Sequence, residues 1–403
     1  MYKLVWRNVW RHRRRTWLTV TAIATALSLL SVMMCMQEGT YAHMIRRATH
    51  LWYGVLQIQH AQYADEPSLY HSFRITPAIS RLLDMTADAW SPRIVHHGLV
   101  SLGQETRGGK IVGIDPQREW TWIRHALERG RWLRTSGEAL LGSGLAQSLG
   151  ATPDSEIAVL VQARDGSIGA RLFRVVGIFR VHMPDLDRSG VLIHRDAADD
   201  LCVMRGRVTT VVLRVPMKQM DTIRRNLRAA LHAQGMRDLT VRAWSELVPE
   251  MVQAIETDRV SGWLYYGVLL VVVGFGMLNT LYMSIYERNK EIGILRAIGM
   301  TRRRLLTMIG GEAAVLACIG VITGLAIGVP VILYLQAHPI RLGGELAKLY
   351  ESFMFEPAIY TRLDSHVLMR LSGLVIGFAL ISAVFPAWHT LRLALPDLLK
   401  FQK

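Results

Sequence analysis

Residues 263–285 read WLYYGVLLVVVGFGMLNTLYMSI, a run of 23 residues without a charged side chain. A helix needs about 20 mainly apolar residues to cross the roughly 30 Å hydrocarbon core of a bilayer. Three further uncharged runs of comparable length occupy residues 17–37, 313–335 and 371–388. Core helices of soluble proteins are rarely so long and so free of charge, so the sequence predicts four transmembrane helices.

The rest of the chain is more polar. Of its 403 residues, 51% are hydrophobic and 20% are charged, and the mean hydropathy is +0.22. This average indicates a few spanning helices joined to a large water-exposed part. The three cysteines, Cys35, Cys202 and Cys318, lie far apart without a CxxC pair, so neither a disulfide framework nor a metal site is predicted.

Positive charge is concentrated in three short segments. Residues 1–16, 286–306 and 389–403 together carry 15 Lys and Arg against 3 Asp and Glu. The loops 38–262 and 336–366 are nearly neutral, with 28 basic against 24 acidic residues and 3 against 4. The positive-inside rule therefore places both termini and the 286–306 linker in the cytoplasm. Because topology accounts for most of the net charge of +15, no nucleic-acid partner is predicted.

The predicted fold class is a polytopic α-helical membrane protein with four transmembrane helices and a large α+β extracytoplasmic domain between the first and the second. In chain order we expect a basic cytoplasmic segment (1–16), transmembrane helix 1 (17–37), the extracytoplasmic domain (38–262), helix 2 (263–285), a cytoplasmic linker (286–306), helix 3 (307–335), a short outer loop (336–366), helix 4 (367–388) and a cytoplasmic tail (389–403). The predicted location is the inner (plasma) membrane.

The first apolar run could instead belong to a signal peptide, since the basic stretch 11–15 precedes it. The run is longer than the apolar core of a typical signal peptide. Its end, MCMQ (34–37), also offers no small-residue cleavage site. A retained membrane anchor is therefore the preferred interpretation.

The extracytoplasmic domain alternates strand-like and helix-like patterns and is long enough, at 225 residues, for two lobes. Val208–Val215 reads as a buried strand and Met217–Gln234 as an amphipathic helix. Ile157–Gln162 and Leu172–Phe179 read as strands joined by a turn at Asp165-Gly166. Trp244–Arg259 reads as a helix that continues into the second transmembrane segment.

Motifs for enzymatic chemistry are absent from the sequence. No G-x-x-x-x-G-K-[ST] phosphate loop occurs, since Gly109-Lys110 is followed by Ile111. There is no HExxH, and no carboxylate lies within the apolar runs, so a metal site and a proton relay are not predicted. We expect a chain that is not itself an enzyme and holds no cofactor.

Two apolar runs carry glycines at helical spacing. Gly320, Gly324 and Gly328 share one face of the third helix, and Gly373 and Gly377 share one face of the fourth. Small residues at this spacing let two helix backbones approach closely inside a bilayer. The alternative is the general glycine richness of membrane helices, so the pattern favours helix packing without requiring it.

The N-terminal segment has an amphipathic pattern. Tyr2, Val5, Trp6, Val9 and Trp10 recur at helical spacing, with basic residues on another face. Such a helix lies at the membrane surface, with its aromatic rings among the lipid headgroups. A basic leader that only sets topology is the alternative.

The cytoplasmic linker is richer in apolar residues than a simple connector requires. Residues 287–305 read ERNKEIGILRAIGMTRRRL, in which charged residues alternate with Ile292, Ile294, Leu295, Ala297 and Ile298. The pattern predicts a short amphipathic helix that ends near Gly299. An apolar face in the cytoplasm needs a partner protein or the membrane to cover it.

These residues resemble a known family. The linker segments ER (287–288), EIG (291–293) and AIG (297–299) resemble the coupling helix of FtsX-like, MacB-type (type VII) ABC transporter permeases. Further resemblances lie in WRN (6–8), GIDP (113–116), GRWL (130–133), GSGLA (142–146), VVGI (175–178) and FPAW (385–388). The chain departs from the family at GATPDS (150–155), where the usual Gly-Asp turn is missing.

The resemblance implies a permease subunit that transmits ATPase-driven motion to its periplasmic domain. ATP and Mg²⁺ would be bound by a separate cytoplasmic ABC ATPase, and a second permease copy or homologue would complete a dimer. A periplasmic carrier or adaptor and membrane lipid are further implied partners. The coupling-helix residues implied to contact the ATPase are Glu287, Arg288, Glu291, Ile292, Gly293, Leu295, Arg296, Ala297, Ile298 and Gly299.

In length and layout the chain is most similar to the lipoprotein-releasing permeases LolC and LolE of this family, which implies extraction of lipoproteins or lipids from the inner membrane. Efflux of peptides or drugs and signalling across the cell envelope remain alternatives. A membrane-anchored sensor without an ATPase is disfavoured, because a sensor needs no coupling helix.

Overall fold

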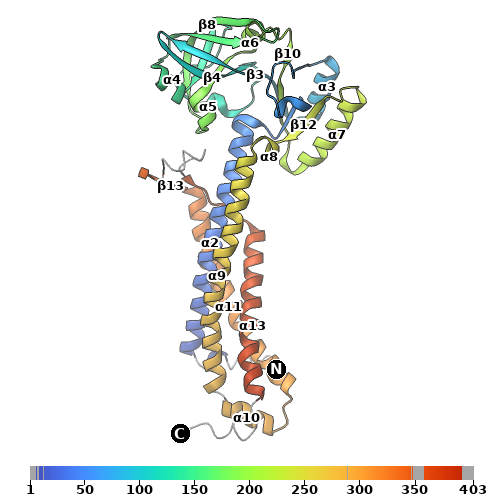
Figure 1. Cartoon of the computed structure of the whole chain (residues 1–403). Coiled ribbons are helices and arrows are strands. Elements are labelled where there is room, and N and C mark those ends of the chain that lie inside the picture. Colours follow the sequence, from blue (N-terminus) through green and yellow to red (C-terminus); the bar gives the residue numbers. More distant parts are fainter. Residues whose placement is uncertain are drawn as a thin grey trace. The chain divides into compact units, whose positions relative to one another are not determined.

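The computed structural model of the protein describes residues 6, 9–11, 13–287, 289–345, 347 and 358–392. The chain divides into two compact units, whose elements are drawn in Figure 1. The helical unit comprises Met1–Ala42, Ala254–Arg341 and Ala358–Lys403. The sheet unit comprises His43–Gln253 and Leu342–Pro357.

Within the described residues, four helices are long and apolar enough to cross a membrane, in agreement with the four predicted spans. They are α2 (Arg13–Ala48), α9 (Pro249–Glu287), α11 (Arg302–Ala337) and α13 (Ser365–Arg392). Helix α9 begins at Pro249 and continues without interruption into the second apolar run. The expected continuation of a helix into that run is therefore confirmed, although Trp244–Leu247 forms a separate short helix, α8.

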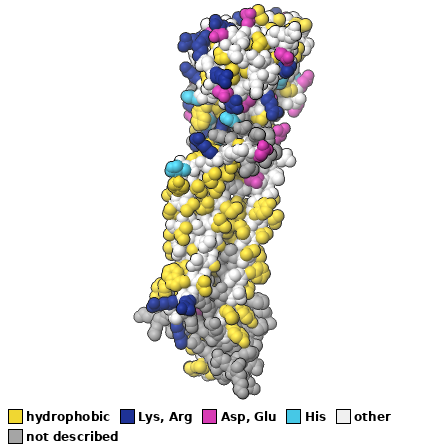
Figure 2. Space-filling view, turned by 90° about the vertical axis from the view of Figure 1, so that its left-hand side faces the viewer, with side chains coloured by type: hydrophobic (Ala, Val, Ile, Leu, Met, Phe, Trp, Pro, Cys, Tyr) yellow, Lys and Arg dark blue, Asp and Glu magenta, His cyan; other side chains and the backbone are white. Residues whose placement is uncertain are grey.

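The helical unit is apolar both inside and outside. Ile23 and Leu27 of α2 pack in one buried cluster with Ala317 of α11 and Leu371 of α13. Large apolar side chains also point outward, as Ile322 does with 68% of its surface exposed. Figure 2 shows hydrophobic side chains spread over the surface of these helices. An apolar exterior on membrane-length helices is the surface that lipid chains require.

The sheet unit is built on one ten-stranded sheet with the order β12-β1-β11-β3-β4-β9-β6-β8-β5, in which β7 pairs with both β3 and β8. Its strands are β1 (Leu56–His60), β3 (Ala89–Leu102), β4 (Glu105–Ile114), β5 (Leu127–Gly130), β6 (Glu138–Gly142), β7 (Glu156–Gln162), β8 (Ile168–Phe179), β9 (Gly190–His194), β11 (Thr210–Arg214) and β12 (Leu239–Ala243). Two-residue strands β2 (Phe73–Arg74) and β10 (Arg207–Val208) pair separately, as do β13 (Ile340–Arg341) and β14 (Ala358–Ile359) of the helical unit.

Helices cover parts of the sheet and form separate buried clusters with its strands. Around β1, β11 and β12, one core includes residues of α3 (Pro77–Thr86) and α7 (Met220–Ala233). Around β3, β6, β7 and β8, another includes residues of α4 (Ser143–Leu149) and α6 (Arg195–Cys202). Helix α5 (Pro184–Ser189) adds Leu186 to a third cluster. The strands and the helices that cover them form an α+β unit, as expected.

The strand pairing follows the predicted hairpin. β7 and β8 are antiparallel, with Ile157 opposite Phe173, and the chain turns between them at Asp165-Gly166. The strand predicted at Val208–Val215 is divided instead, because Thr209 separates β10 from β11. Thr209 donates its hydroxyl to the carbonyl of Arg93 and accepts a hydrogen bond from the amide of Val95, which interrupts a regular ladder.

A buried ion pair lies at the centre of the sheet unit. Arg93 of β3 is 1% exposed and makes two bonds to the carboxylate of Glu119, of 2.7 and 3.1 Å. Ser91 and Thr121 also donate to Glu119, at 2.9 and 2.6 Å. A third donor of Arg93 reaches the carbonyl of Trp52 at 2.7 Å. Burial alone would raise the pKa of Glu119, but the charge and hydrogen bonds of Arg93 outweigh it and hold that pKa below its usual value.

Candidate functional site

The linker between α9 and α11 contains the predicted amphipathic helix, α10 (Asn289–Ala297). It ends in a Schellman turn, because the amide of Met300 donates to the carbonyl of Leu295 at 3.0 Å and that of Gly299 to Arg296 at 3.1 Å. Gly299 has a φ of 99°, a left-handed conformation that glycine adopts without strain. In Figure 1, α10 lies at the end of the helical bundle where α2 begins.

The apolar residues of α10 divide between two faces. Ile292 is 3% exposed and packs with Leu305, Met308 and Ile309 in one cluster, which Leu295 partly joins. Ile294 and Ile298 are 52% and 79% exposed. Successive helical residues are turned by about 100°, so Ile294 and Ile298 share a face nearly opposite to Ile292.

This division corrects one part of the sequence interpretation. We expected Ile292, Ile294, Leu295 and Ile298 to form one face that a partner covers. Instead, the start of α11 already covers Ile292 and part of Leu295. Gly293 is buried, and Ala297 is exposed beside the two outward isoleucines. Arg288 lies outside the described residues, as do the side chains of Glu287 and Glu291, which the coupling-helix assignment also included.

The glycines of α11 lie against α2. A Cβ on Gly320 would lie 2.5 Å from Cγ2 of Ile23, and one on Gly324 would lie 2.9 Å from the carbonyl oxygen of Ala24. At Gly328 the nearest atom would be the hydroxyl of Ser31, at 2.8 Å. These distances are too short for a real Cβ, so the absence of side chains is what allows the two helices to approach this closely.

The glycines of α13 differ. A Cβ on Gly373 or Gly377 would meet no described atom of the chain within 4 Å. The predicted packing role of these two residues is therefore wrong for contacts within the described part of this chain. Spacing alone cannot distinguish a glycine face that meets another helix from one that faces outward.

A polar cluster joins α2 to α9; we term it the α2–α9 clasp and define it as Gln37, Glu38, Tyr41, Asp258, Arg259 and Tyr266. Gln37 donates to the Asp258 carboxylate at 3.0 Å, and the Tyr41 hydroxyl donates to the same carboxylate. Tyr266 donates to the Gln37 side-chain oxygen at 2.9 Å. Arg259 forms an ion pair with Glu38, with 3.3 Å between Nη2 and Oε1.

Sequence reasoning missed the clasp. Its hydrogen bonds join residues that are far apart in the chain. Gln37 and Asp258, for example, are separated by 221 positions. The available signal was that Gln37-Glu38 ends one apolar run while Asp258-Arg259 precedes another. Only the pairing of α2 with α9 turns those polar residues into contacts. The clasp ties the first two membrane-length helices together where their apolar runs give way to polar sequence.

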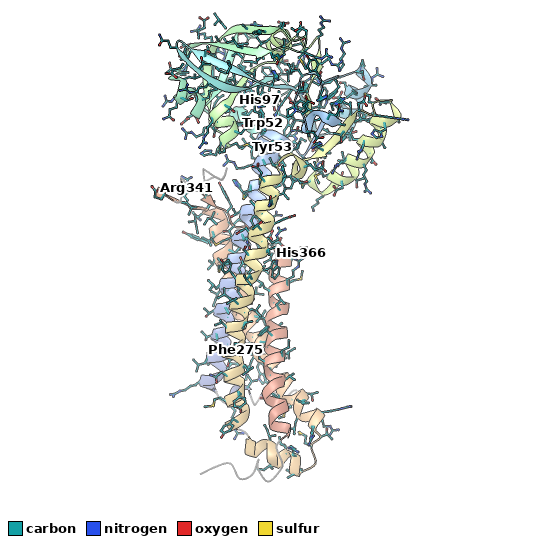
Figure 3. All side chains as sticks on the ribbon, viewed as in Figure 1. Trp52, Tyr53, His97, Phe275, Arg341 and His366 are labelled. Carbon is teal, nitrogen blue, oxygen red and sulfur yellow. The ribbon has the colours of Figure 1, made fainter. Side chains whose placement is uncertain are left out.

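The sheet unit contains a cleft of about 400 Å³ whose lining includes Trp52, Tyr53 and His97, labelled in Figure 3. Its floor includes two nearly buried amides on β1. Gln59 donates to the side-chain oxygen of Gln57 at 2.7 Å, and Gln57 donates to the carbonyl of Tyr53 at 2.7 Å. The side-chain oxygen of Gln59 is buried and has no hydrogen-bond partner among the described residues.

Cysteine and metal-ligand chemistry have little support among the described residues. Cys202 is fully buried, and burial raises its pKa to about 12, so the thiol is unreactive near neutral pH. Within the described ranges, no group of three or more His, Cys, Asp and Glu side chains is arranged to hold a metal ion.

Comparisons with known proteins match two family models to the chain. The family model of the MacB-like periplasmic core domain matches residues 16–230, and that of the FtsX-like permease C-terminal region matches residues 263–395. Similar proteins include an uncharacterized ABC transporter permease of Methanocaldococcus jannaschii, 26% identical over 223 residues, which are 54% of each chain.

Two lipoprotein-releasing system transmembrane proteins are also similar. LolC of Neisseria meningitidis is 23% identical over 252 residues, 60% of each chain. LolE of Haemophilus influenzae is 22% identical over 354 residues, 84% of this chain and 82% of LolE. The chain thus spans 54% and 60% of the length of the first two relatives, and more of the third.

Proposed function

The chain belongs to the FtsX-like ABC transporter permeases that carry a MacB-like periplasmic core domain, and from this membership we propose that it transmits the motion of a partner ATPase to that domain, in order to extract lipoproteins or lipids from the inner membrane. Family membership implies an ABC transporter with an ATPase subunit. The proposed complex contains two permease chains, with ATP and Mg²⁺ on the ATPase, and passes its cargo to a periplasmic carrier.

The observation that carries the proposal is the outward face of α10. Ile294 and Ile298 expose apolar surface one helical turn apart, while Ile292 on the other face fixes α10 to α11. A partner that covers the two isoleucines can therefore push or pull α11 through α10. Exposed apolar residues at i and i+4 are a usual anchor for a groove in a partner protein.

Continuous helices supply a route for the motion. Helix α9 runs through 39 residues from Pro249 to Glu287, and a straight helix of that length is roughly 58 Å long. The clasp joins it to α2, and the glycines of α11 join α2 to α11. A displacement at α10 would then move these helices together, because packed helices shift as units.

Lipoprotein or lipid cargo is proposed because the similarity to LolE covers most of both chains. Efflux of peptides or drugs and envelope signalling remain the alternative, since the chain also matches the model of the MacB-like periplasmic core domain. Identifying the molecules that copurify with the complex from native membranes distinguishes the two. Enrichment of acylated protein would favour extraction, and a soluble peptide or drug-like cargo would favour efflux.

Replacing Ile294 and Ile298 together by Ala should weaken association with the ATPase at least tenfold. Each change removes apolar surface worth roughly 1.5–3 kcal/mol when fully buried. The measurement is pull-down of the ATPase by the full-length permease, with transport assayed in parallel. The thermal unfolding midpoint of the double variant should match that of the wild type, because both side chains are exposed in the chain alone.

Ile292→Ala is the matched control for this experiment. It removes the same atoms from the buried face, so it should lower thermal stability rather than abolish ATPase contact directly. Ile322→Ala, on the exposed surface of α11, should alter neither property. Wild-type ATPase binding and transport by the Ile294/Ile298 double variant would refute the coupling role of this face.

The proposed topology places both termini and α10 in the cytoplasm and the sheet unit outside. Because Cys202 is buried, native labelling of this thiol cannot test it. In a Cys318→Ser background, we expect Gln104→Cys, in the exposed β3–β4 turn, to react with a membrane-impermeant reagent in intact spheroplasts. Ala297→Cys should react only after permeabilisation. Labelling of Ala297→Cys in intact spheroplasts would reverse the orientation.

A further inference from the structure

The cleft of about 400 Å³ that includes Trp52, Tyr53 and His97 lies wholly within the sheet unit. Its volume falls in the range of about 300–1,000 Å³ that is usual for small-molecule sites. None of its described lining residues belongs to α10 or to the clasp. The cleft is therefore a candidate site separate from the proposed coupling face.

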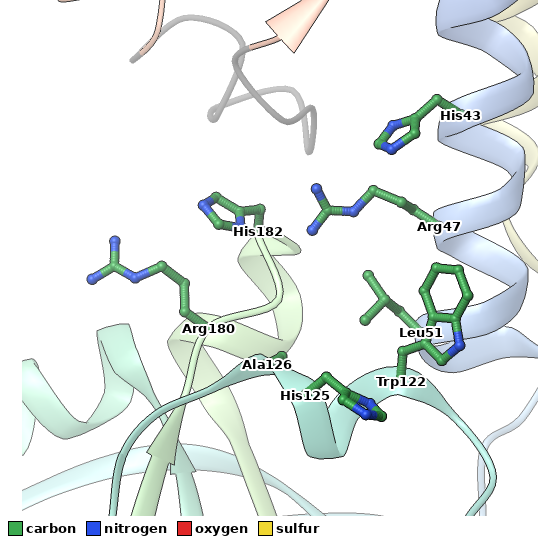
Figure 4. Close-up of a pocket in the computed structure, with 8 residues that line it drawn as sticks. All are labelled: His43, Arg47, Leu51, Trp122, His125, Ala126, Arg180 and His182. Atoms are coloured by element: carbon green, nitrogen blue, oxygen red, sulfur yellow. The ribbon is translucent and has the colours of Figure 1, made fainter. Parts of the chain in front are cut away.

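A second hollow of the sheet unit, of about 490 Å³ and drawn in Figure 4, lies beside His182. Its basic side chains already have partners. Arg47 donates to the carbonyl of Val181 at 3.3 Å, and Asp187 lies close enough to His182 and Arg180 to act on both through its charge. The cleft differs from this hollow, because several of its hydrogen-bonding groups are unused.

The floor of the cleft is the polar face of the sheet. Gln57 of β1 lies opposite Arg242 of β12, and Gln59 of β1 lies opposite Thr210 of β11. Residues directly opposite each other in an antiparallel pair project from the same face. The intervening Ile58 belongs to the apolar core that includes residues of α3 and α7. Polar side chains thus gather on the face that borders the cleft.

The amides of the floor form a one-way chain of hydrogen bonds. Gln57 donates to the carbonyl of Tyr53 and accepts from Gln59, both at 2.7 Å. Gln59 is only 5% exposed, and its side-chain oxygen accepts no hydrogen bond from a described residue. Hydrogen-bonded amides polarise one another, so the acceptor at the end of the chain is strengthened. A buried oxygen without a donor costs free energy, which a ligand N–H would recover.

Two donors of the cleft are also unused. The hydroxyl of Tyr53 and the guanidinium of Arg242 form no hydrogen bond or ion pair with a described residue. Asp185 and Glu250 lie near enough to act on the Tyr53 hydroxyl through their charge, but neither accepts a hydrogen bond from it. A ligand oxygen at this place can accept from both donors, because a carbonyl oxygen has two lone pairs.

The other charged side chains of the lining are paired within the sheet unit. The ion pairs are Arg93–Glu119, Lys110–Asp185 and Glu246–Arg224. Burial, and next the charge of Lys110, lower the pKa of His97 below its ordinary value, so its imidazole is neutral near pH 7. The lining therefore favours a ligand that is recognised by hydrogen bonds rather than by a strong charge.

We propose that the cleft binds a secondary amide group, whose N–H donates to the side-chain oxygen of Gln59 and whose carbonyl oxygen accepts from Tyr53 and Arg242. The row of Gln59 and the row of Gln57 and Arg242 are two residues apart along β1, roughly 7 Å. The N–H and C=O of a trans amide point in opposite directions, so the group with its two hydrogen bonds spans about 8 Å. Acetamido sugars and peptides both contain this group, and the test separates the two sources.

The test measures ligand binding to the purified full-length chain by ligand-observed NMR, in a polyoxyethylene detergent that contains neither sugar nor amide groups. The ligands are N,N′-diacetylchitobiose, cellobiose and an acetylated, amidated dialanine peptide. Cellobiose has the two-ring frame of diacetylchitobiose with hydroxyls in place of the acetamido groups, so it is the matched control ligand. We expect saturable binding of at least one amide ligand, and at least tenfold weaker binding of cellobiose.

Two variants connect binding to the floor. Gln59→Met keeps the length of the side chain but removes the open oxygen, so it should bind the amide ligand at least tenfold more weakly. Its unfolding midpoint should stay close to that of the wild type, because loss of one hydrogen bond is offset by removal of an unsatisfied buried oxygen. Tyr53→Phe removes only an unused hydroxyl and should weaken binding two- to fivefold. Tyr70→Phe, an exposed tyrosine outside the lining, should bind as the wild type does.

Preference for diacetylchitobiose identifies an acetamido sugar as the ligand, and preference for the peptide identifies backbone amides. Either preference supports the site when Gln59→Met loses it. Cellobiose binding as tight as that of the amide ligands, no saturable binding of either amide ligand, or unchanged binding by Gln59→Met overturns the proposal. Should Gln59→Met fail to fold, unchanged binding by Tyr53→Phe overturns it. None of these outcomes depends on the ATPase, so the role of α10 is tested separately.

Discussion

Arg93→Met should destabilise the sheet unit by about 3–5 kcal/mol, because it leaves the carboxylate of Glu119 buried without its counter-ion. The cost is large since Arg93 donates two bonds to Glu119 and a third to Trp52, and its guanidinium lies 4.3 Å from the centre of the Trp52 ring. Methionine replaces the aliphatic part of the side chain but none of its donors.

Protection of Cys202 provides the measurement. The thiol is fully buried in the sheet unit, so its rate of labelling in a Cys35→Ala/Cys318→Ser background reports opening of this unit in the full-length protein. Arg93→Met should accelerate labelling by two or more orders of magnitude. The double variant R93M/E119Q should recover part of the loss, since it contains no unpaired buried charge. Labelling of Arg93→Met at the wild-type rate would contradict the importance of this pair.

The same ion pair makes the stability of the sheet unit depend on pH. The pKa of Glu119 is lower in the folded protein than its ordinary value of 4.5. A carboxyl with a lowered pKa stabilises the fold above the unfolded pKa, and this contribution is lost as pH falls through the folded pKa. We therefore expect Cys202 labelling to accelerate below about pH 4.5, and the acceleration to be smaller in R93M/E119Q. The comparison needs a reagent whose own reactivity is calibrated at each pH.

Gly324→Leu should separate α11 from α2 and abolish transport. A Cβ at this position would lie 2.9 Å from the carbonyl oxygen of Ala24 and 3.1 Å from its Cα. Both are backbone atoms, so no side-chain rotation can relieve the overlap. Forcing extra volume into a packed interface costs typically about 1–3 kcal/mol, and here the whole leucine side chain must be accommodated. Thermal unfolding in detergent and a transport assay measure the effect.

Gly377→Leu on α13 is the matched control. The substitution is the same and the position is also a glycine within an apolar helix, but no described atom lies within 4 Å of the new Cβ. We expect an unfolding midpoint close to that of the wild type. If Gly324→Leu were as stable and active as Gly377→Leu, close packing of α2 on α11 would not matter for the protein.

Local sequence was sufficient for features that depend on local chemistry. Absence of charge over 263–285 predicted a spanning helix, and the turn residues Asp165-Gly166 predicted the β7–β8 hairpin. Each of these signals lies within the element that it specifies. The family assignment likewise rested on short segments, and all of these except WRN (6–8) lie within the ranges that the family models match.

Features that depend on which elements meet could not be predicted in the same way. The burial of Ile292 depends on the start of α11, and the open space beside Gly377 depends on which neighbours α13 lacks among the described residues. The hollow beside His182 combines residues from three separate parts of the chain. Periodicity describes one element at a time, so it gives the faces of a helix but not the partner of each face. The predicted role of residues 346 and 348–357, and of the tail from 393, lies outside the described residues.

The position of β1 has a consequence for the order of events during synthesis. β1 is among the first strands to be made, yet it is hydrogen-bonded to β11 and β12, with Leu56 opposite Leu213 and Ala243. No pairing of β1 within the ten-stranded sheet can form until most of the unit has been synthesised, and closing such long loops is slow. Strand β12 ends at Ala243, only six residues before α9 begins at Pro249. A nascent chain must therefore keep β1 unpaired until the second membrane helix is about to emerge, and during that interval the exposed strand is a target for chaperones and for aggregation.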